Sequence, residues 1–535
     1  PRLPGAGHRP KYGSSGSSDT SLHAKSFAVD GLRVFVGASN FDPHSITRYL
    51  PTPVDCDSRN QRLGRAKAGA VIMAGRKAFA WQIHIASSRE SAGDRMRGYH
   101  PLMTNPLTNA LEASFDGMAP ELLEIYKDLH VHPELSMQEH RTAGIAAGYI
   151  EKLGYAVTRE VGVTGVVGLL RNGDGPTVML RGDMDALPMA EDTGLPYASQ
   201  VTATDSDGQQ VGVAHSCGHD LHVTWLLGAA RVLAESRDAW QGTAMVVFQP
   251  GEETAEGARR MVEDWDRAGL PHPDIVLGEH VMVGPAGTVS YRSGVILSAG
   301  DSLKVKLFGR GAHGSQPQNS IDPVIMAAAT TLRLQTIVSR EISPRDSAVL
   351  TVGSLQAGTK ENIIPDDATI KLNLRTYDED VRDHLLKAVR RICCAECEAS
   401  NAPRPPEFTT LSSYPLTDND HGATERVVEA FKAEFGDDAH EATPAAASED
   451  FSVFGRTWNV PYVFWFVGGT DPRAYAKAKE ERQLNAIPSN HSPRFAPVLE
   501  PTLRTGLQAM LTAASAWLCV HADGLRAVEP VGERG

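Results

Sequence analysis

The sequence predicts an α/β protein with a central, mostly parallel sheet flanked by helices in its catalytic domain, and a small α+β domain inserted into it. Short apolar strands alternate with helices from about residue 119 onward, which is typical of a parallel sheet. The pattern changes near Asp301 and reverts near Tyr414. At 535 residues, 41% of them hydrophobic, the chain is too long for one core and can fill several.

Residues 1–110 are expected to form a disordered N-terminal extension. They contain Gly/Ser-rich and Pro-containing stretches and many Arg residues, with no sustained helical or strand period. Their only apolar run, residues 68–74, is too short for a signal peptide core or a membrane span. Position 1 is Pro, so Met96 or Met103 could be the translation start. We expect a cytoplasmic protein.

The catalytic domain is expected at residues 111–298 and 412–523, followed by a tail at 524–535. Three of its predicted strands end directly at polar residues, and ligands of parallel sheets bind beyond the carboxyl ends of the strands. Strand 177–180 precedes Asp183 and Asp185, strand 244–248 precedes Glu252 and Glu253, and strand 275–277 precedes Glu279 and His280. Further elements are helices at 121–130, 141–153 and 223–236 and a strand at 462–467.

The inserted domain is expected at residues 299–411. Its elements follow the order β-α-β-β-α, which predicts a small ferredoxin-like α+β sandwich. The strands are predicted at 303–308, 348–355 and 370–376, and the helices at 323–339 and 379–397.

Charge and cysteine content exclude several classes of protein. A formal net charge of −13 and a pI near 5.8 argue against binding to nucleic acid or anionic membranes. Six irregularly spaced cysteines suit a reducing compartment. Cys393 and Cys397 continue an apolar i, i+4 stripe, so with Cys394 they are expected to pack in a core rather than to bind metal.

The segment HSCGHD, residues 215–220, is the strongest candidate for a metal site. Cys217 and His219 are separated by one residue, so an irregular turn could aim both at one pair of metals. The alternative is a buried structural Cys beside a helix-capping His. Asp185 is expected to support a metal-bound imidazole from behind, while His215 and His222 are expected to pack.

Three downstream fragments supply the remaining groups. In the Glu252-Glu253 pair, Glu253 is assigned to metal and Glu252 to the general base and acid, although a surface acidic pair is the usual alternative. His280 and His491 would each be an ordinary polar residue alone. Together with the others they give five ligands, which suffice for two divalent metals.

The order of motifs resembles a known family over about residues 115 to 520. RGDMDALP, HSCGHD, PGEE, GEHV, GAHGSQPQNSIDP, ENIIPDDA, LRTYDEDVR, SEDF and NHSPRF are similar to the metal-dependent peptidase M20 and aminoacylase family, in the amidohydrolase branch with hippurate hydrolases and auxin-conjugate amidohydrolases. Glu279 departs from this pattern, because an apolar or small residue is expected at its position in many relatives. Its carboxylate would add charge near the metals.

The resemblance implies roles for individual residues. Cys217, His219, Glu253, His280 and His491 would bind two divalent ions (zinc, manganese, cobalt or nickel), and Glu252 would activate water. The insert would be a lid and dimerisation domain of a homodimer. His313 would stabilise the oxyanion, often in the partner's active site, while Asn362 and Arg375 would hold the substrate carboxylate. The alternatives are a loop histidine without a role and an Arg375 ion pair with Asp378 or Glu379.

The expected activity is hydrolysis of the amide bond of an N-acyl amino acid or a related conjugate, with Glu252 as base and then acid. A dipeptidase or carboxypeptidase of the same family is one alternative. A protein that binds metal or amino acids without catalysis is another, although such a protein has no need of Glu252.

Overall fold

The computed structural model describes residues 27–29, 32–34, 70–74, 77–81 and 105–519. The chain divides into two compact units, residues 1–95 and 96–535. Most of the predicted extension and the predicted tail at 524–535 lie outside the described residues. Within the extension, strands β1 (Phe27–Val29) and β2 (Leu32–Val34) form one hairpin, and β3 (Ala70–Ala74) and β4 (Lys77–Trp81) form another.

The expectation of a disordered extension at residues 1–110 stays a prediction, because most of these residues lie outside the part of the chain that the structure describes. Strands β3 and β4 are apolar runs separated by Gly75 and Arg76, a two-residue spacing that is typical of a tight hairpin. The predicted start of the catalytic domain at residue 111 needs correction. Helix α1 spans Pro106–Val131, so the folded domain begins before residue 111.

An eight-stranded mixed sheet is the framework of the catalytic domain, in the order β21-β12-β22-β11-β7-β10-β6-β5. Four pairings are parallel, and they include all three among β10, β7, β11 and β22 in the centre. Three pairings nearer the edges are antiparallel. The strands are β5 (Ala156–Val161), β6 (Gly165–Asn172), β7 (Thr177–Asp183), β10 (Gly242–Gln249), β11 (Ile275–Pro285), β12 (Val289–Tyr291), β21 (Ala439–Glu441) and β22 (Tyr462–Thr470).

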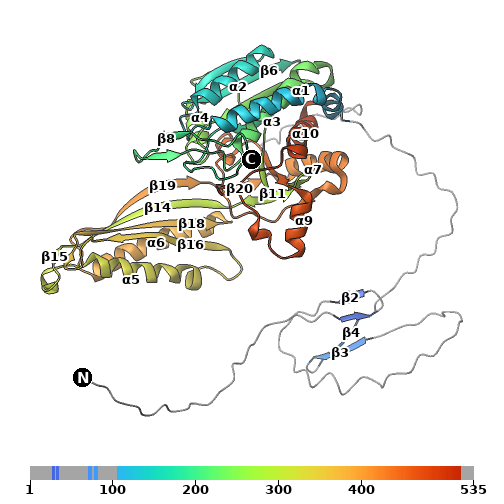
Figure 1. The fold of residues 1–535 in the computed structure, drawn as a ribbon. Helices are drawn as coiled ribbons and strands as arrows, with labels where there is room; N and C mark the ends of the chain where they lie inside the picture. Colours follow the sequence, from blue (N-terminus) through green and yellow to red (C-terminus); the bar gives the residue numbers. More distant parts are fainter. Residues whose placement is uncertain (1–26, 30–31, 35–69, 75–76, 82–104, 520–535) are drawn as a thin grey trace, which may run out of the picture. The chain divides into compact units, whose positions relative to one another are not determined.

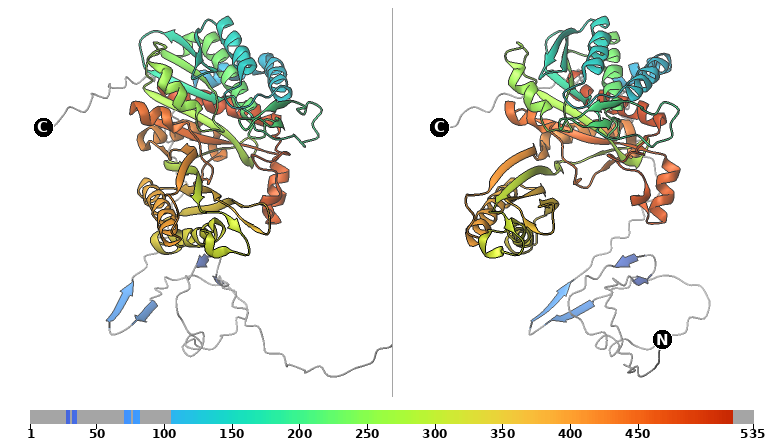
Figure 2. Two further views of the ribbon diagram at one scale, coloured as in Figure 1. Left: turned by 90° about the vertical axis from the view of Figure 1, so that its left-hand side faces the viewer. Right: turned by 60° about the vertical axis from the view of Figure 1, so that its left-hand side comes forward.

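Helices cover both faces of this sheet (Figures 1 and 2). Alternate residues of β7 point to opposite faces, so Val178 and Leu180 join one core while Met179 joins the other. One core includes α1, α2 (His140–Lys152), α3 (His219–Glu235), α7 (His421–Phe435) and α10 (Leu499–Leu518), and the other includes α4 (Gly257–Trp265) and α8 (Ser452–Trp458). None of the helices in the described part of the chain is both long and apolar enough to span a bilayer.

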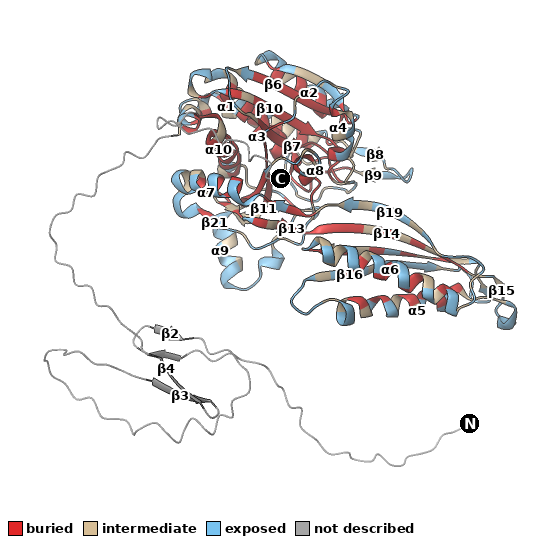
Figure 3. Ribbon diagram, turned by 180° about the vertical axis from the view of Figure 1, so that it is seen from behind, coloured by how far each residue is buried: buried red, intermediate tan, exposed pale blue. Residues whose placement is uncertain are grey.

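The inserted domain has its own four-stranded antiparallel sheet, in the order β16-β18-β14-β19, with its own core (Figure 3). Strand β19 was not predicted, and it extends the insert to Tyr414 instead of residue 411. Cys393 and Cys397 are buried in this core as predicted, while Cys394 is half-buried. The elements are β14 (Ala299–Phe308), α5 (Pro323–Thr336), β16 (Ala348–Ala357), β18 (Asp367–Thr376), α6 (Glu379–Ala399) and β19 (Glu407–Tyr414).

Short elements connect these parts. Strands β13 (Gly294–Leu297) and β20 (Thr417–Asn419) pair where the chain enters and leaves the insert. Strands β15 (Ala312–His313) and β17 (Ile363–Ile364) pair beyond the other end of β14. Strands β8 (Thr202–Thr204) and β9 (Gln210–Gly212) form a hairpin, and α9 (Pro472–Glu480) follows β22.

Candidate metal centre

Cys217 and His219 are presented by a sharp turn at the start of helix α3. Gly218 between them has a left-handed backbone (φ 89°) and caps the helix, whose first residue is His219. A Cβ on Gly218 would lie 2.4 Å from Cγ1 of Val281, so the turn requires glycine. The irregular turn predicted for this pair is therefore present.

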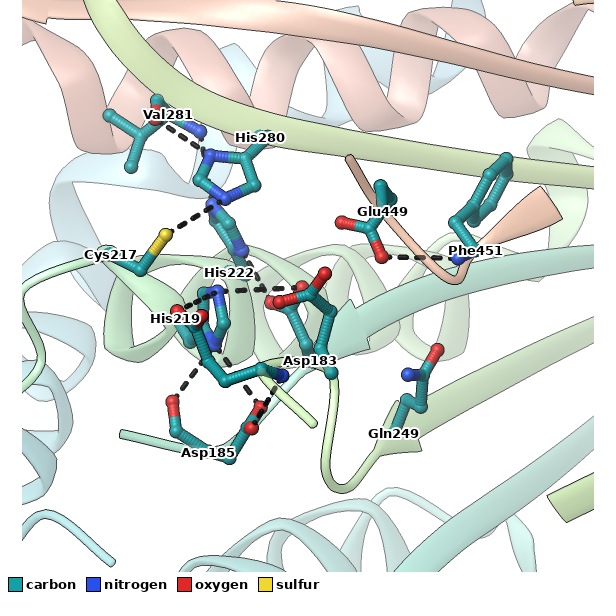
Figure 4. A network of polar contacts seen from close by, with 12 residues as sticks. Asp183, Asp185, Cys217, His219, His222, Gln249, His280, Val281, Glu449 and Phe451 are labelled. Atoms are coloured by element: carbon teal, nitrogen blue, oxygen red, sulfur yellow. Dashed lines mark hydrogen bonds and ion pairs between the residues drawn. The ribbon is translucent and has the colours of Figure 1, made fainter. Parts of the chain in front are cut away.

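His280 and His491 reach the same place from distant segments. The Sγ atom of Cys217 lies 3.4 Å from Nε2 of His280 (Figure 4), and Nε2 of His491 lies 3.2 Å from Oε1 of Glu253. His491 has a left-handed backbone (φ 66°), a strained conformation for a residue other than glycine and one that often marks functional sites.

The ligand atoms form overlapping groups that fit a metal. Cys217, His219 and His280 form one group and Cys217, Glu253 and His491 another, with all ligand atoms in a group within 4.8 Å of one another. Nε2 of His219 and Oε1 of Glu253 are buried without a hydrogen-bond partner among the described residues. Since unpaired buried polar atoms are costly, these orphaned atoms fit a cation. We call these five residues the five-ligand cluster.

Asp185 lies behind the five-ligand cluster and contacts two of its residues. Nδ1 of His219 donates to the carbonyl oxygen of Asp185 at 2.8 Å, which leaves Nε2 for the cluster. One carboxylate oxygen of Asp185 accepts from the hydroxyl of Ser136 at 2.6 Å and from the backbone N–H of Glu253 at 2.9 Å. Asp185 thus orients two of the five side chains.

Glu252 is buried beside the cluster, with only 5% of its surface exposed. Its carboxylate groups with those of Glu449 and Asp450 within 4.8 Å, and with His219 and Glu253 in a second set. Burial raises the pKa of Glu252 well above its usual value, and the charges of Glu449 and Glu253 add to the shift. A cation bound at the cluster would oppose this shift, so the group is suited to exchange a proton.

Arg181 balances the acidic groups beneath Glu252 and was not among the predicted site residues. This fully buried guanidinium donates to Asp183 at 2.6 Å and to Glu449 at 2.7 Å. A further N–H donates to the side-chain oxygen of Gln249 at 2.8 Å. The two carboxylates of SEDF were the available signal for a buried cation, because buried carboxylates without a partner are rare.

Two other side chains, one half-buried and one buried, hold the loops of the site and were also missed. Asn490 donates to the carbonyl oxygens of Cys217 at 3.1 Å and of Val281 at 3.0 Å. Glu139 accepts from the backbone N–H of Gly251 at 2.8 Å and from the hydroxyl of Thr164 at 2.5 Å. Both act on backbone from remote segments, which no local pattern predicts.

His215 and His222 pack as expected. His222 shares a hydrogen bond of 2.5 Å with Asp183 through Nδ1, and its Nε2 accepts from the backbone N–H of Val281 at 3.0 Å (Figure 4). Both ring nitrogens are thus used by the protein. His215 is buried, and neither ring nitrogen has a partner among the described residues.

Glu279 does not add charge near the metals, which corrects that expectation. Successive residues of a strand face opposite ways, so Glu279 points away from the side of His280. Its Oε2 accepts from the indole N–H of Trp465 at 2.8 Å, and burial raises its pKa well above the usual value. Burial at this place thus favours the neutral form of the carboxyl group.

The predicted residues of the insert lie at its two ends. His313 and Asn362 are together beyond the end of β14, where the backbone N–H of Gly314 donates to Asn362 at 2.8 Å. Arg375 lies at the opposite end of the sheet, where it donates to Ser448 and Asn373. The alternative ion pair of Arg375 is absent among the described residues, because Asp378 caps α6 and Glu379 pairs with Arg382 and Arg456.

A cluster of thiolate, imidazole and carboxylate ligands beside a buried carboxylic acid defines a metal-dependent hydrolase. Residues 179–489 match the family model described as peptidase family M20/M25/M40. The chain belongs to this family.

Similar proteins and solved structures support this family membership. The chain is 34% identical to the putative amidohydrolase YhaA of Bacillus subtilis over 412 residues, which cover 76% of this chain and 96% of that protein. It is 36% identical to the hippurate hydrolase of Campylobacter jejuni over 361 residues, 65% of this chain and 90% of that one. The YXEP protein of Bacillus subtilis, a dinuclear metal binding peptidase of the M20 family, has a TM-score of 0.59 at 28% identity over 75% of this chain and 98% of its own.

Proposed function

We propose that this enzyme hydrolyses the amide bond of N-acyl amino acids or related amide conjugates. The observation that carries the proposal is the buried carboxylic acid of Glu252 beside the five-ligand cluster. The likeness to a hippurate hydrolase along most of that protein supports an acylated amino acid as substrate.

We further propose two divalent ions in each subunit. Cys217 belongs to both ligand groups, so these five side chains would together hold the ions. Thiolate with imidazole suits zinc, and manganese, cobalt and nickel are compatible with the same donors. When bound, these ions polarise the scissile carbonyl group and lower the pKa of water.

Glu252 handles the proton in both halves of the reaction. It accepts a proton from water as the water oxygen bonds to the carbonyl carbon, and it returns this proton to the amine nitrogen as the C–N bond breaks. The products are a carboxylic acid and an amine. Asp185 keeps His219 and Glu253 in place throughout, because it bonds to both.

The oxyanion donor and the side chains that bind the substrate carboxylate are proposed to come from two copies of the chain. Strand β14 has ten residues and so spans about 30 Å, with His313 beyond one end and Ser448 of the catalytic domain against the other. His313 therefore cannot reach Glu252 of its own chain. Its Nδ1 accepts from the backbone N–H of Ser315, which leaves an Nε2–H donor for an oxyanion in the partner's site.

A homodimer would also cover an apolar surface of the insert. On α5, Ile325 is 66% exposed and Leu332 is 74% exposed, and on the edge strand β16, Val349 is 47% exposed. An exposed edge strand beside apolar side chains favours pairing with a second sheet. Arg375 and Asn362, from opposite ends of the insert, would then meet a substrate carboxylate from different subunits.

The cytoplasm is the proposed location. All five cysteines in the described part of the chain are free thiols, and Cys217 must be reduced to bind metal.

Replacement of Glu252 tests the proposed function. We expect E252Q to keep its metal content and to lose at least about 10²-fold in kcat, because the proton acceptor is gone. Metal analysis and hydrolysis of N-acetyl and N-benzoyl amino acids measure the two effects. The matched control is E263Q, on the exposed side of α4, which should keep wild-type turnover.

Near-normal turnover by E252Q on the enzyme's substrate would contradict the assignment of the base. Preferred cleavage of dipeptides over acylated amino acids would favour the peptidase alternative. Metal uptake without hydrolysis of any conjugate would favour a binding protein.

A further inference from the structure

The insert contacts the catalytic domain through one row of side chains at the end of its sheet. Gly300 on β14 is paired with Tyr414 on β19 and with Arg375 on β18. The hydroxyl of Tyr414 donates to the backbone carbonyl oxygen of Glu252 at 3.1 Å, and Arg375 donates to the hydroxyl of Ser448. Ser448 directly precedes Glu449, so the row touches both loops that surround Glu252.

The fit at this row is close. A Cβ on Gly300 would lie 2.6 Å from Oγ of Ser448 and 2.9 Å from Nη1 of Arg375. A side chain at Gly300 would therefore displace the side chains of Ser448 and Arg375, which join the insert to the catalytic loops.

The peptide unit between Glu252 and Glu253 is held from both sides. Tyr414 binds its carbonyl oxygen, and Asp185 binds its N–H at 2.9 Å. A peptide unit is planar, so fixing both polar groups fixes the positions of the two Cα atoms from which the flanking side chains leave the backbone. These side chains are the base and a metal ligand of the proposed function.

We propose that Tyr414 is a positioning residue for Glu252, through which the insert controls the orientation of the base. This inference rests on the proposed role of Glu252. Tyr414 is the last residue of β19, so its hydroxyl carries the position of the insert to the peptide unit that follows Glu252. The base keeps this orientation while the hydrogen bond of Tyr414 is present.

The hydroxyl of Tyr414 is suited to this task because it remains a donor. Burial, together with the negative charges of Glu252 and Glu253, raises the pKa of Tyr414 above its ordinary value. The phenol therefore keeps its proton through the range in which an amidohydrolase works.

The test compares Y414F with two controls in the metal-saturated full chain. Y377F is the same change at the residue that follows β18, and E379Q removes the contact of the insert with Arg456 of α8. We expect Y414F to lower kcat roughly tenfold or more, since small displacements of a catalytic group are costly, with KM and metal content within twofold of wild type. Both controls should keep kcat within twofold.

A double variant shows whether Tyr414 acts through Glu252. In the E252Q background, Y414F should have no further effect on the residual rate, because the group that it positions is already lost. An equal loss of kcat in E379Q would overturn the proposal, since general loosening of the insert would then explain the effect. Wild-type kcat in Y414F would overturn it as well, while leaving the proposed function intact.

Hydrogen exchange separates this inference from the proposed function. We expect faster amide exchange at Glu253 in Y414F than in wild type or Y377F, because the clamp on that peptide unit is open. If the wild-type enzyme hydrolyses no acylated amino acid, the proposed function fails, and faster exchange still supports the clamp. Unchanged exchange in Y414F overturns the clamp whatever the activity.

Discussion

At the scale of single residues, His130 carries a charge inside the protein. It is 3% exposed, and its ring bonds to Asp220 at 2.6 Å and to Glu191 at 3.1 Å. Burial lowers the pKa of His130, but the hydrogen bonds to the two carboxylates outweigh burial and raise it to about 10. Asp220 directly follows His219, so the ion pair supports the start of α3.

This ion pair makes stability depend on pH. The folded-state pKa of His130, about 10, lies above the unfolded value of 6.5, so its contribution is complete below pH 6.5 and is lost as pH rises towards 10. We expect the free energy of unfolding to fall by up to about 1.4 kcal/mol per pH unit more steeply in wild type than in H130Q over this window. Thermal and urea unfolding between pH 6.5 and 9.5 measure the difference.

The exposed His272 provides the control, because H272Q should keep the wild-type slope. An H130Q slope equal to that of wild type would show that His130 is not charged in the folded protein.

The proximity of the five proposed ligands and Glu252 was predictable because each lies in a short motif with a recognisable chemical reason. The residues that hold them in place could not be predicted. Arg181 and Glu449, or Asn490 and Val281, meet only after the chain has folded, and their spacing in the sequence carries no sign of the contact. Their roles depend on which buried charge faces which backbone group, and tertiary structure decides this.

At the scale of elements, strands and helices were predicted where periodicity was strong, and their ends were not. Strand β11 runs to Pro285 rather than ending at Leu277, because β22 continues to pair with it after β7 has ended. His280 therefore lies within a strand, two residues beyond the last pairing of β11 with β7 at Gly278. The outer strands β5, β6, β12 and β21 were missed; three of them have only three to six residues, and such short runs have weak patterns.

The start of α1 shows the same limit and gives a prediction. The side chain of Asn105 accepts from the backbone N–H groups of Leu107 and Thr108, which caps the helix. We expect N105A to lower the free energy of unfolding by about 1 kcal/mol. Urea unfolding measures this, with N109A on the exposed side of the same turn as the control.

An equal effect of N105A and N109A would mean that the cap is unimportant and that the helix starts later, as the sequence had suggested. A larger loss of unfolding free energy in N105A than in N109A would agree with the start of α1 at Pro106.

At the scale of the whole molecule, the placement of His313 predicts complementation between two inactive variants. E252Q lacks the base and H313A lacks the oxyanion donor. In a mixed dimer, the site of the H313A subunit receives His313 from the partner. Equal mixing should restore about a quarter of wild-type activity, because half of the dimers are mixed and each has one complete site.

Activity of the remixed variants, measured after dissociation and reassociation, tests this outcome. No recovery, together with a monomeric mass by light scattering, would mean that His313 does not act across subunits. L332E on the exposed side of α5 should dissociate the dimer, while L411E on the opposite edge strand should not.

The insert interrupts the catalytic domain, and this has a consequence for biosynthesis. Strand β22 lies inside the sheet between β11 and β12, yet it follows the whole insert in the chain, as does His491. Translation proceeds from the N-terminus, so a ribosome-bound chain must wait with an open groove in its sheet until the last segment emerges. The proposed metal site is therefore completed late, and a chain truncated before β22 would expose that groove to chaperones and proteases.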